Sequence, residues 1–297
     1  MFKKILSTAL AMAMVLSMAV STSAALGKPG SSTPSTKTEQ SSSGSKKSSS
    51  SSSSSKGYDL CKTQLAKDKL ALNMHNTFLS GLKANKDKIT VSIKGYTEKQ
   101  VYTAFQNSLQ MIFDEHPEIF WLDTMQNLVV SSDHKTLTFY PRPASGYGTA
   151  SKDGLSASKL NTTAIKNATT KMNEAVKKMT GSTDYEQVKA IHDAIINKTQ
   201  YPANPDKATH NQHQAVGPLV EGKAVCDGYA KAFKYACDQK GIPCVIVVGN
   251  ATNNIGEKGT HAWNYVKVGG SWYQVDTDWD DPQTKGGNSK SYLRSEE

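Results

Sequence analysis

The feature that most constrains the fold of this chain is a pair of adjacent glycines near its C-terminus. Gly269 and Gly270 separate two runs of aromatic and β-branched residues, THAWNYVKV and SWYQVDTDW. Glycine adopts the backbone angles that a two-residue hairpin turn requires, and runs of this composition are typical of strands. The sequence therefore predicts an antiparallel hairpin over residues 260–279, with its turn at the two glycines.

The register of this hairpin predicts which side chains meet. If the residues that flank the glycine pair face each other, His261 faces Asp278 and Trp263 faces Asp276. Side chains alternate between the two faces of a strand, so these four residues share one face. Asp276 is then a diagonal neighbour of His261, within reach of long side chains. The register predicts an imidazole beside a carboxylate, but it does not choose between Asp276 and Asp278.

A single cysteine marks the predicted start of a helix in GKAVCDGYAKAF. The N–H groups at a helix N-terminus favour negative charge, so Cys226 there is a candidate nucleophile. The same N–H groups are suited to hold the oxyanion of a tetrahedral intermediate. The ordinary alternative is a small buried hydrophobic residue. After the cysteine, apolar residues recur at helical spacing until Gly241, at Tyr229, Ala230, Phe233 and Cys237.

Together these motifs resemble the transglutaminase-like superfamily, which includes transglutaminases, cysteine peptidases and related thiol enzymes. The family pattern has a Cys followed by Gly-Tyr-Ala, a His in His-Ala-Trp-Asn, and an Asp in a Val-Asp-x-Thr-Trp run. IHDAI and HQAVGPLVEGKAVC also look like bacterial members, so the resemblance covers roughly residues 184–282. The matching positions are Cys226, Gly228, Tyr229, Ala230, His261, Ala262, Trp263, Asn264, Val275, Asp276 and Trp279.

The resemblance implies an α+β fold with a transglutaminase-like, papain-like core, in which the nucleophile helix packs on an antiparallel sheet. It also implies Cys226 as nucleophile, His261 as general base and Asp276 as the carboxylate that orients the base. Asp278 stands where the family usually has Thr, and two outcomes are open: a second carboxylate facing His261 either raises the pKa of His261 or is simply solvated. The candidate substrate-binding residues are Tyr229, Trp263, His213 and Asp278.

The activity that follows from this resemblance is acyl transfer from peptide or isopeptide amides, with hydrolysis of the cysteine-peptidase kind favoured. Cross-linking by amide transfer from glutamine to lysine is the first alternative. A non-catalytic module that binds cell-surface peptides is the second, and it would leave Cys226 unreactive at neutral pH. No metal or organic cofactor is implied. The expected partner is a protein or peptide substrate, with the cell wall and the cell surface as candidate locations.

The N-terminal part of the sequence predicts export. Residues 1–25 combine Lys3 and Lys4, an uncharged and largely apolar run, and small residues, as in a secretory signal peptide. An uncleaved membrane anchor is the alternative; after removal of a signal peptide no membrane span is expected, and the protein would be secreted or associated with the cell surface. Residues 26–57 are rich in Ser, Lys and Gly and predict a disordered linker.

Two further regions complete the predicted organisation. Residues 58–150 predict a subdomain of helices and a β-hairpin, with a helix from about residue 58 and another capped by Thr97. Residues 151–297 predict the catalytic domain, with helices near 157–180 and after a capping box at Thr183. The net charge of +9 is scattered, without the basic stripe of a nucleic-acid groove. Cys237 and Cys244 are either a disulfide or two buried thiols.

Overall fold

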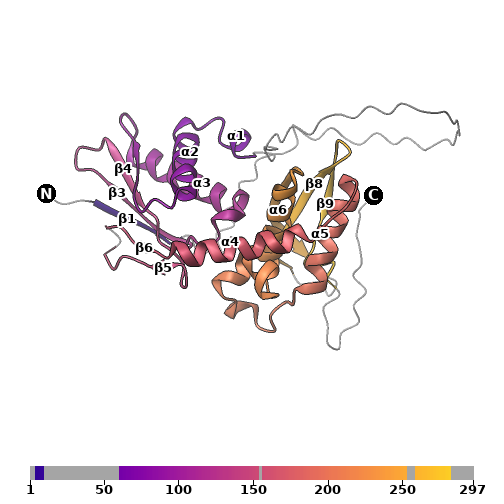
Figure 1. Ribbon diagram of the computed structural model, residues 1–297. Coiled ribbons are helices and arrows are strands. Elements are labelled where there is room, and N and C mark those ends of the chain that lie inside the picture. The colour runs from indigo at the N-terminus through magenta and orange to yellow at the C-terminus, as the bar shows by residue number, and fades with distance from the viewer. Residues whose placement is uncertain (1–3, 10–59, 154–155, 253–257, 282–297) are drawn as a thin grey trace, which may run out of the picture. The chain divides into compact units, whose positions relative to one another are not determined.

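The structure is a computed structural model that describes residues 4–9, 60–153, 156–252 and 258–281 (Figure 1). The predicted linker at 26–57, and most of the predicted signal peptide, lie outside the described residues. Within them, helices combine with antiparallel sheets, which confirms the predicted α+β class. None of the helices in this described part is both long enough and apolar enough to span a membrane.

The N-terminal region packs helices beside a four-stranded sheet with the strand order β1-β3-β4-β2. The β-hairpin predicted within residues 58–150 is confirmed as β3 and β4, and its turn contains His134 at a φ of 53°. Thr97 caps α3 in a capping box with Gln100. The elements are α1 (Leu60–Gln64), α2 (Lys69–Lys83), β2 (Ile89–Ser92), α3 (Glu98–Glu115), a 3-10 turn η2 (Pro117–Ile119), β3 (Met125–Val130) and β4 (Thr136–Tyr140).

Strand β1 (Lys4–Ala9) lies within the predicted signal peptide. It pairs antiparallel with β3, from Lys4 opposite Val130 to Ala9 opposite Met125. Cleavage after residue 25 would remove β1 and leave β3 at the edge of the sheet. The cleaved signal peptide stays a prediction.

Two predicted helices are shorter in the structure. The helix expected from residue 58 is interrupted before α2, where the Asp68 side chain accepts a hydrogen bond from Ala71 N at 2.9 Å and so starts a new helix. The helix expected near 157–180 is α4 (Thr162–Lys177), because Asn161 caps it. Just before the cap, β6 (Lys159–Leu160) pairs with β5 (Gly148–Thr149). In both cases a short polar side chain sets the helix start, as expected for N-caps.

The C-terminal region places one helix against a three-stranded sheet with the order β7-β8-β9 (Figure 1). Helix α6 packs on β7 and β8, and α5 packs on α6. Thr183 and Glu186 form the predicted capping box of α5. The elements are α5 (Asp184–Lys198), the short helices η3 (Pro205–Lys207), η4 (His210–His213) and η5 (Gly217–Glu221), α6 (Cys226–Lys240), β7 (Cys244–Thr252), β8 (Lys258–Val268) and β9 (Ser271–Val275).

The predicted hairpin register is confirmed between β8 and β9. Val268 lies opposite Ser271, and the pairing continues in the same register to Val275. Gly269 and Gly270 have φ angles of 57° and 92°, which only glycine adopts readily, so the turn requires them. The strand, however, ends at Val275 rather than at residue 279. Residues 276–281 follow it as turns and not as strand pairs.

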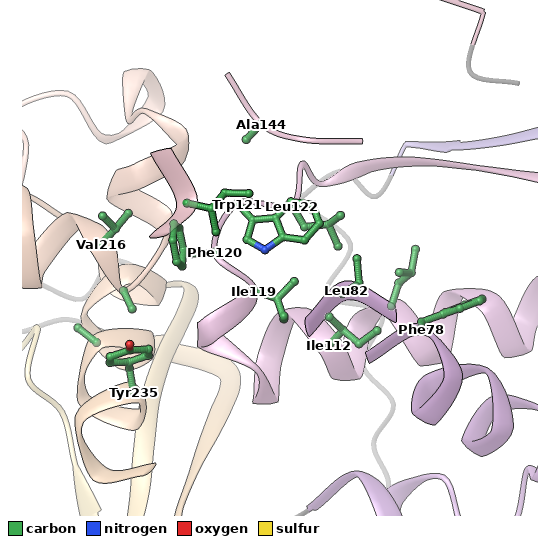
Figure 2. Packing of buried hydrophobic residues seen from close by; sticks show 14 of the residues in the cluster. Phe78, Leu82, Ile112, Ile119, Phe120, Trp121, Leu122, Ala144, Val216 and Tyr235 are labelled. Carbon is green, nitrogen blue, oxygen red and sulfur yellow. The ribbon is translucent and has the colours of Figure 1, made fainter. Parts of the chain in front are cut away.

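One cluster of buried hydrophobic residues includes both regions (Figure 2). Phe120 and Trp121, which are 1% and 2% exposed, lie between Leu82 on α2 and Val216, next to η5, in this view. A buried ion pair adds to the packing, since Lys234 Nζ of α6 lies 3.3 Å from Glu115 Oε2 of α3. The residues before and after position 150 therefore share one core.

Candidate active site

Cys226 is the first residue of α6 and is partly exposed. The N-cap residue Val225 makes no side-chain capping bond to the N–H groups of the first turn. Gly228 permits a close approach of η4 to this helix start, because a Cβ at this position would lie 2.1 Å from Gln212 O. Val225 N also donates to Gln212 O at 3.1 Å. The thiol thus lies at a helix N-terminus held by the preceding segment.

His261 lies on β8 and is 6% exposed. Its Nε2 is 2.7 Å from Asp276 Oδ2, a hydrogen bond between the strand and the turn that follows β9. The other carboxylate oxygen, Asp276 Oδ1, accepts from Asp278 N at 3.2 Å and Trp279 N at 3.1 Å. The turn therefore fixes the carboxylate, and the carboxylate orients the ring. Of the two predicted aspartates, Asp276 is the one that hydrogen-bonds His261.

The ring of His261 also meets the cysteine. A ligand atom from each of Cys226, His261 and Asp278 lies within 4.8 Å of the other two, so the ring lies close to the Cys226 sulfur. Because Nε2 is bound to Asp276, we infer that the Nδ1 edge faces the sulfur. Nδ1 is 3.9 Å from Asp278 Oδ2. The structure brings together Cys226, His261 and Asp276, the three predicted catalytic residues, and places Asp278 beside them.

The surroundings of His261 favour its charged form. Burial lowers the pKa of His261, but hydrogen bonds to Asp276 and Cys226 and the charges of Asp276 and Asp278 outweigh burial and raise the pKa to about 10. At neutral pH the ring is then an imidazolium. A positive charge beside a thiol stabilises the thiolate, which is the nucleophilic form.

Asp278 is the acidic group most affected by this environment. Burial raises the pKa of Asp278 to about 7, helped by the neighbouring Asp276, Asp281 and Asp227 and opposed by His261. Asp278 therefore changes charge close to neutral pH, within 4 Å of the imidazole. This second carboxylate makes the charge at the site depend on pH.

Two tryptophans stack on His261. The Trp279 ring centroid lies 4.5 Å from that of His261 with an angle of 17° between the planes, and the Trp263 centroid lies at 5.9 Å with 21°. Trp263 also fits against Gly249 on β7, where a Cβ would come within 2.9 Å of the indole. Trp279 is 40% exposed, so it covers the ring from the solvent side. The contacts of Trp263 are with residues of the site and its sheet.

The turn that carries Asp276 and Asp278 is tied to two helices. His192 Nε2 on α5 lies 3.1 Å from Asp280 Oδ2, and Tyr229 Oη on α6 donates to Asp281 Oδ2 at 2.5 Å. Tyr229, predicted to bind substrate, is fully buried and makes this internal contact. The pair of His192 and Asp280 was not predicted, because 88 residues separate them and no motif links them.

The remaining predicted substrate-binding residue, His213, lies on η4 beside the helix start. Its Nδ1 is 2.9 Å from Asp227 Oδ1, and its carbonyl accepts from Lys231 Nζ at 2.9 Å. Tyr201 is a neighbour that the sequence did not suggest. Burial raises its pKa, and the nearby negative charges of Asp278, Cys226 and Asp227 add to the effect.

A second group of side chains in the described part of the chain has converging ligand atoms suited to a metal ion, namely Cys61, His75 and His116. It belongs to the N-terminal region and shares no residue with the site around Cys226. At the Cys226 site one nitrogen of the His261 ring is already bound to Asp276.

Comparisons with known proteins find similarity in the C-terminal part of the chain. Residues 173–277 match the family model of the Transglutaminase-like superfamily. Kyphoscoliosis peptidase of Mus musculus is 34% identical over 106 residues, which are 32% of this chain and 16% of the mouse protein. The protein of the same name from Homo sapiens is 34% identical over 107 residues, 33% of this chain and 16% of the human protein. The matched part is thus a small fraction of each relative.

Two solved structures have partial likeness to the chain. The periplasmic domain of TgpA from Pseudomonas aeruginosa is 19% identical, with a TM-score of 0.29 over 38% of this chain and 42% of that one. A structure described as a TGase is 17% identical, with a TM-score of 0.34 over 69% of this chain and 54% of that one. The resemblance found in the motifs is confirmed by the family match: residues 173–277, which match the transglutaminase-like superfamily, include Cys226, His261 and Asp276.

Proposed function

We propose that the chain is an exported thiol enzyme that transfers acyl groups from peptide or isopeptide amides. The observation that supports it most is the position of one ring: His261 hydrogen-bonds Asp276 through Nε2, and a ring nitrogen lies within 4.8 Å of the Cys226 sulfur. A nucleophile, a base beside it and a carboxylate that orients the base are the three parts that thiol catalysis needs.

In the first half of the reaction the Cys226 thiolate attacks the amide carbonyl carbon. The new C–S bond forms as the carbonyl electron pair moves to oxygen, and N–H groups at the start of α6 stabilise this oxyanion. The His261 imidazolium then protonates the amide nitrogen, the C–N bond breaks, and the amine leaves. An acyl-enzyme remains, and His261 is neutral.

In the second half an acceptor takes the acyl group. Neutral His261 removes a proton from the acceptor, which attacks the thioester carbon and releases the thiolate. With water as acceptor the product is a carboxylic acid, and with a lysine amine it is a new amide. The relatives at 34% identity are named peptidases, which supports hydrolysis as the main reaction; transamidation is the second candidate.

The location and the partners follow from the N-terminal sequence. A cleaved signal peptide over residues 1–25 and a linker over residues 26–57 would leave a basic exported enzyme on a flexible tether, with a peptide substrate at a cell wall or cell surface. Residues 58–150 would form an accessory subdomain, and residues 151–297 the catalytic domain.

A product analysis tests the proposal. The purified chain is incubated with a mixture of peptides, with and without an excess of a dansylated primary amine, and the products are identified by mass spectrometry. We expect cleaved peptides in water, amine adducts as a minor product when the amine is present, and neither with Cys226→Ala. Predominant adducts would favour cross-linking. No product and no acyl-enzyme mass with any peptide would favour the binding module instead.

A further inference from the structure

Three side chains in the N-terminal region converge although they are far apart in sequence. Cys61 comes from α1, His75 from α2, and His116 is the residue that ends α3. One ligand atom of each lies within 4.8 Å of the other two. Cys61 and His75 are each 1% exposed, and the side chain of His116 is 16% exposed. The cluster is therefore buried, with its more open side at His116.

The measured separation fits a metal-binding geometry. Cys61 Sγ lies 3.8 Å from His116 Nε2. Zinc bonds of about 2.3 Å to sulfur and about 2.0 Å to nitrogen, at a tetrahedral angle, place these two atoms about 3.5 Å apart. A shift of a few tenths of an ångström would let both atoms bind one ion. One thiolate and two imidazoles are also the ligand types that zinc prefers.

The neighbours of the two histidines orient them for this role. His116 Nδ1 is 3.1 Å from Glu118 Oε1, so a proton on Nδ1 is donated to the carboxylate and the lone pair of Nε2 is directed at the sulfur. Histidines that bind metals commonly donate their other nitrogen to a carboxylate in this way. His75 Nδ1 lies 3.4 Å from Asn76 Oδ1, which favours the same tautomer.

We propose that Cys61, His75 and His116 form a zinc site, with a water molecule as the fourth ligand on the side of His116. Binding replaces the proton of the Cys61 thiol with a Zn–S bond and releases that proton to solvent. Glu118 neutralises the remaining positive charge of the zinc–thiolate unit, while its contact with Lys83 at 2.9 Å holds it in place.

The site would anchor the start of the folded region. Helix α1 has five residues, too few for its own hydrogen bonds to hold it in place. A metal bound to Cys61 would tie α1 to α2 and to the end of α3. The alternative is that the cluster is only packed, since a thiol–imidazole hydrogen bond and the contact of the two rings, with centroids 5.2 Å apart, also account for the proximity.

Cobalt titration distinguishes these two possibilities. The full chain carries Cys226→Ala, so that the catalytic thiol gives no signal and the result does not depend on the proposed activity. After chelation and dialysis, Co²⁺ is added, and Zn²⁺ is then used to displace it. We expect a thiolate-to-cobalt charge-transfer band in the near ultraviolet that Zn²⁺ abolishes and that Cys61→Ser lacks. Absence of the band, or its persistence in Cys61→Ser, would overturn the proposal.

Matched variants test the orientation of His116. Glu118→Gln should weaken the affinity for Co²⁺ by about 10- to 100-fold, as loss of a carboxylate behind a metal-bound histidine does. Lys83→Gln removes the ion pair with Glu118 but keeps the acceptor for His116, so its affinity should change little. His134→Asn alters an exposed histidine outside the cluster and should match the parent. An equal loss of Co²⁺ affinity in all three variants would contradict a specific metal site at this cluster.

A measurement on the unaltered cluster covers the case in which Cys61→Ser does not fold. Iodoacetamide labelling of Cys61 is followed by mass spectrometry in the Cys226→Ala chain, with and without Zn²⁺. A bound zinc ion should slow the labelling of Cys61 at least tenfold and leave Cys237 and Cys244 unaffected. An unchanged rate for Cys61 at saturating Zn²⁺ would show that its sulfur does not bind the ion.

Discussion

The chain contains two groups in which a histidine connects a cysteine and a carboxylate. In the C-terminal region His261 lies between Cys226 and Asp276, with a 2.7 Å contact to the carboxylate. In the N-terminal region His116 is 3.8 Å from the Cys61 sulfur and 3.1 Å from a carboxylate oxygen of Glu118. By residue type alone, both groups resemble the relay of a thiol enzyme.

Their surroundings separate them. A second carboxylate, Asp278, stands beside His261 and favours the imidazolium, while a second imidazole, His75, stands beside His116 and supplies another lone pair for a metal. Solvent access to the two cysteines differs as well. Cys226 is partly exposed at a helix start, whereas Cys61 is 1% exposed. We therefore propose catalysis for the first group and metal binding for the second, although the residue types are the same.

The largest expected effect is on turnover at the first of these groups. Cys226→Ala should reduce the rate of peptide hydrolysis by on the order of 10³-fold or more, because losing a nucleophile disables the whole relay. The measurement is the initial rate on a cleaved peptide, with circular dichroism to verify the fold. Activity that persists in this variant would remove Cys226 from the role of nucleophile.

The reactivity of the two cysteines compares the groups directly. In the metal-free wild-type chain at pH 7, iodoacetamide should label Cys226 on the order of 10²-fold faster than Cys61, because a thiolate paired with an imidazolium is accessible only at Cys226. Mass spectrometry locates the label over time. His261→Ala should slow the labelling of Cys226 alone. Similar rates at both cysteines would mean that the two environments do not differ as proposed.

Asp278→Asn tests the second carboxylate. The charge of Asp278 helps to raise the pKa of His261 to about 10, so its loss should lower that pKa. The imidazolium is needed below its pKa, and the alkaline limb of the pH–rate profile should therefore move to lower pH by roughly 0.5 to 1 unit. The variant should also lose the step near pH 7 at which Asp278 itself ionises. Asp133→Asn, on an exposed turn, is the control. If the alkaline limb of Asp278→Asn stays in place, Asp278 does not raise the pKa of His261.

The smallest expected effect concerns the indole over His261. Trp279 stacks on the ring at 4.5 Å, an arrangement that favours the imidazolium by about 0.5–1 kcal/mol. Trp279→Ala should therefore reduce the rate about two- to fivefold at alkaline pH, where the proton on His261 is most easily lost, and Trp279→Phe should restore part of it. The rate of each variant is measured from pH 6 to 10. An equal loss of rate at every pH would mean that Trp279 only packs against the ring and does not stabilise its charge.

The sequence predicted the catalytic group from local patterns. The two glycines with positive φ angles set the hairpin register, and the register brought His261 to the same end of the sheet as Asp276 and Asp278. The sequence did not predict that β9 ends at Val275. It therefore could not show which of the two aspartates hydrogen-bonds His261. That choice depends on the turn after the strand, in which Asp276 accepts two backbone N–H groups and so is fixed toward His261.

By itself the sequence determined the α+β class, the α6 start at Cys226, the hairpin and the family, because each depends on spacing within one segment. The tertiary structure alone brought His192 to Asp280 and placed Cys61, His75 and His116 together. These residues carry no zinc-type spacing in the chain. They meet only because hydrophobic packing brings α1, α2 and the end of α3 together, and contacts between distant segments have no periodic signature that a single sequence could reveal.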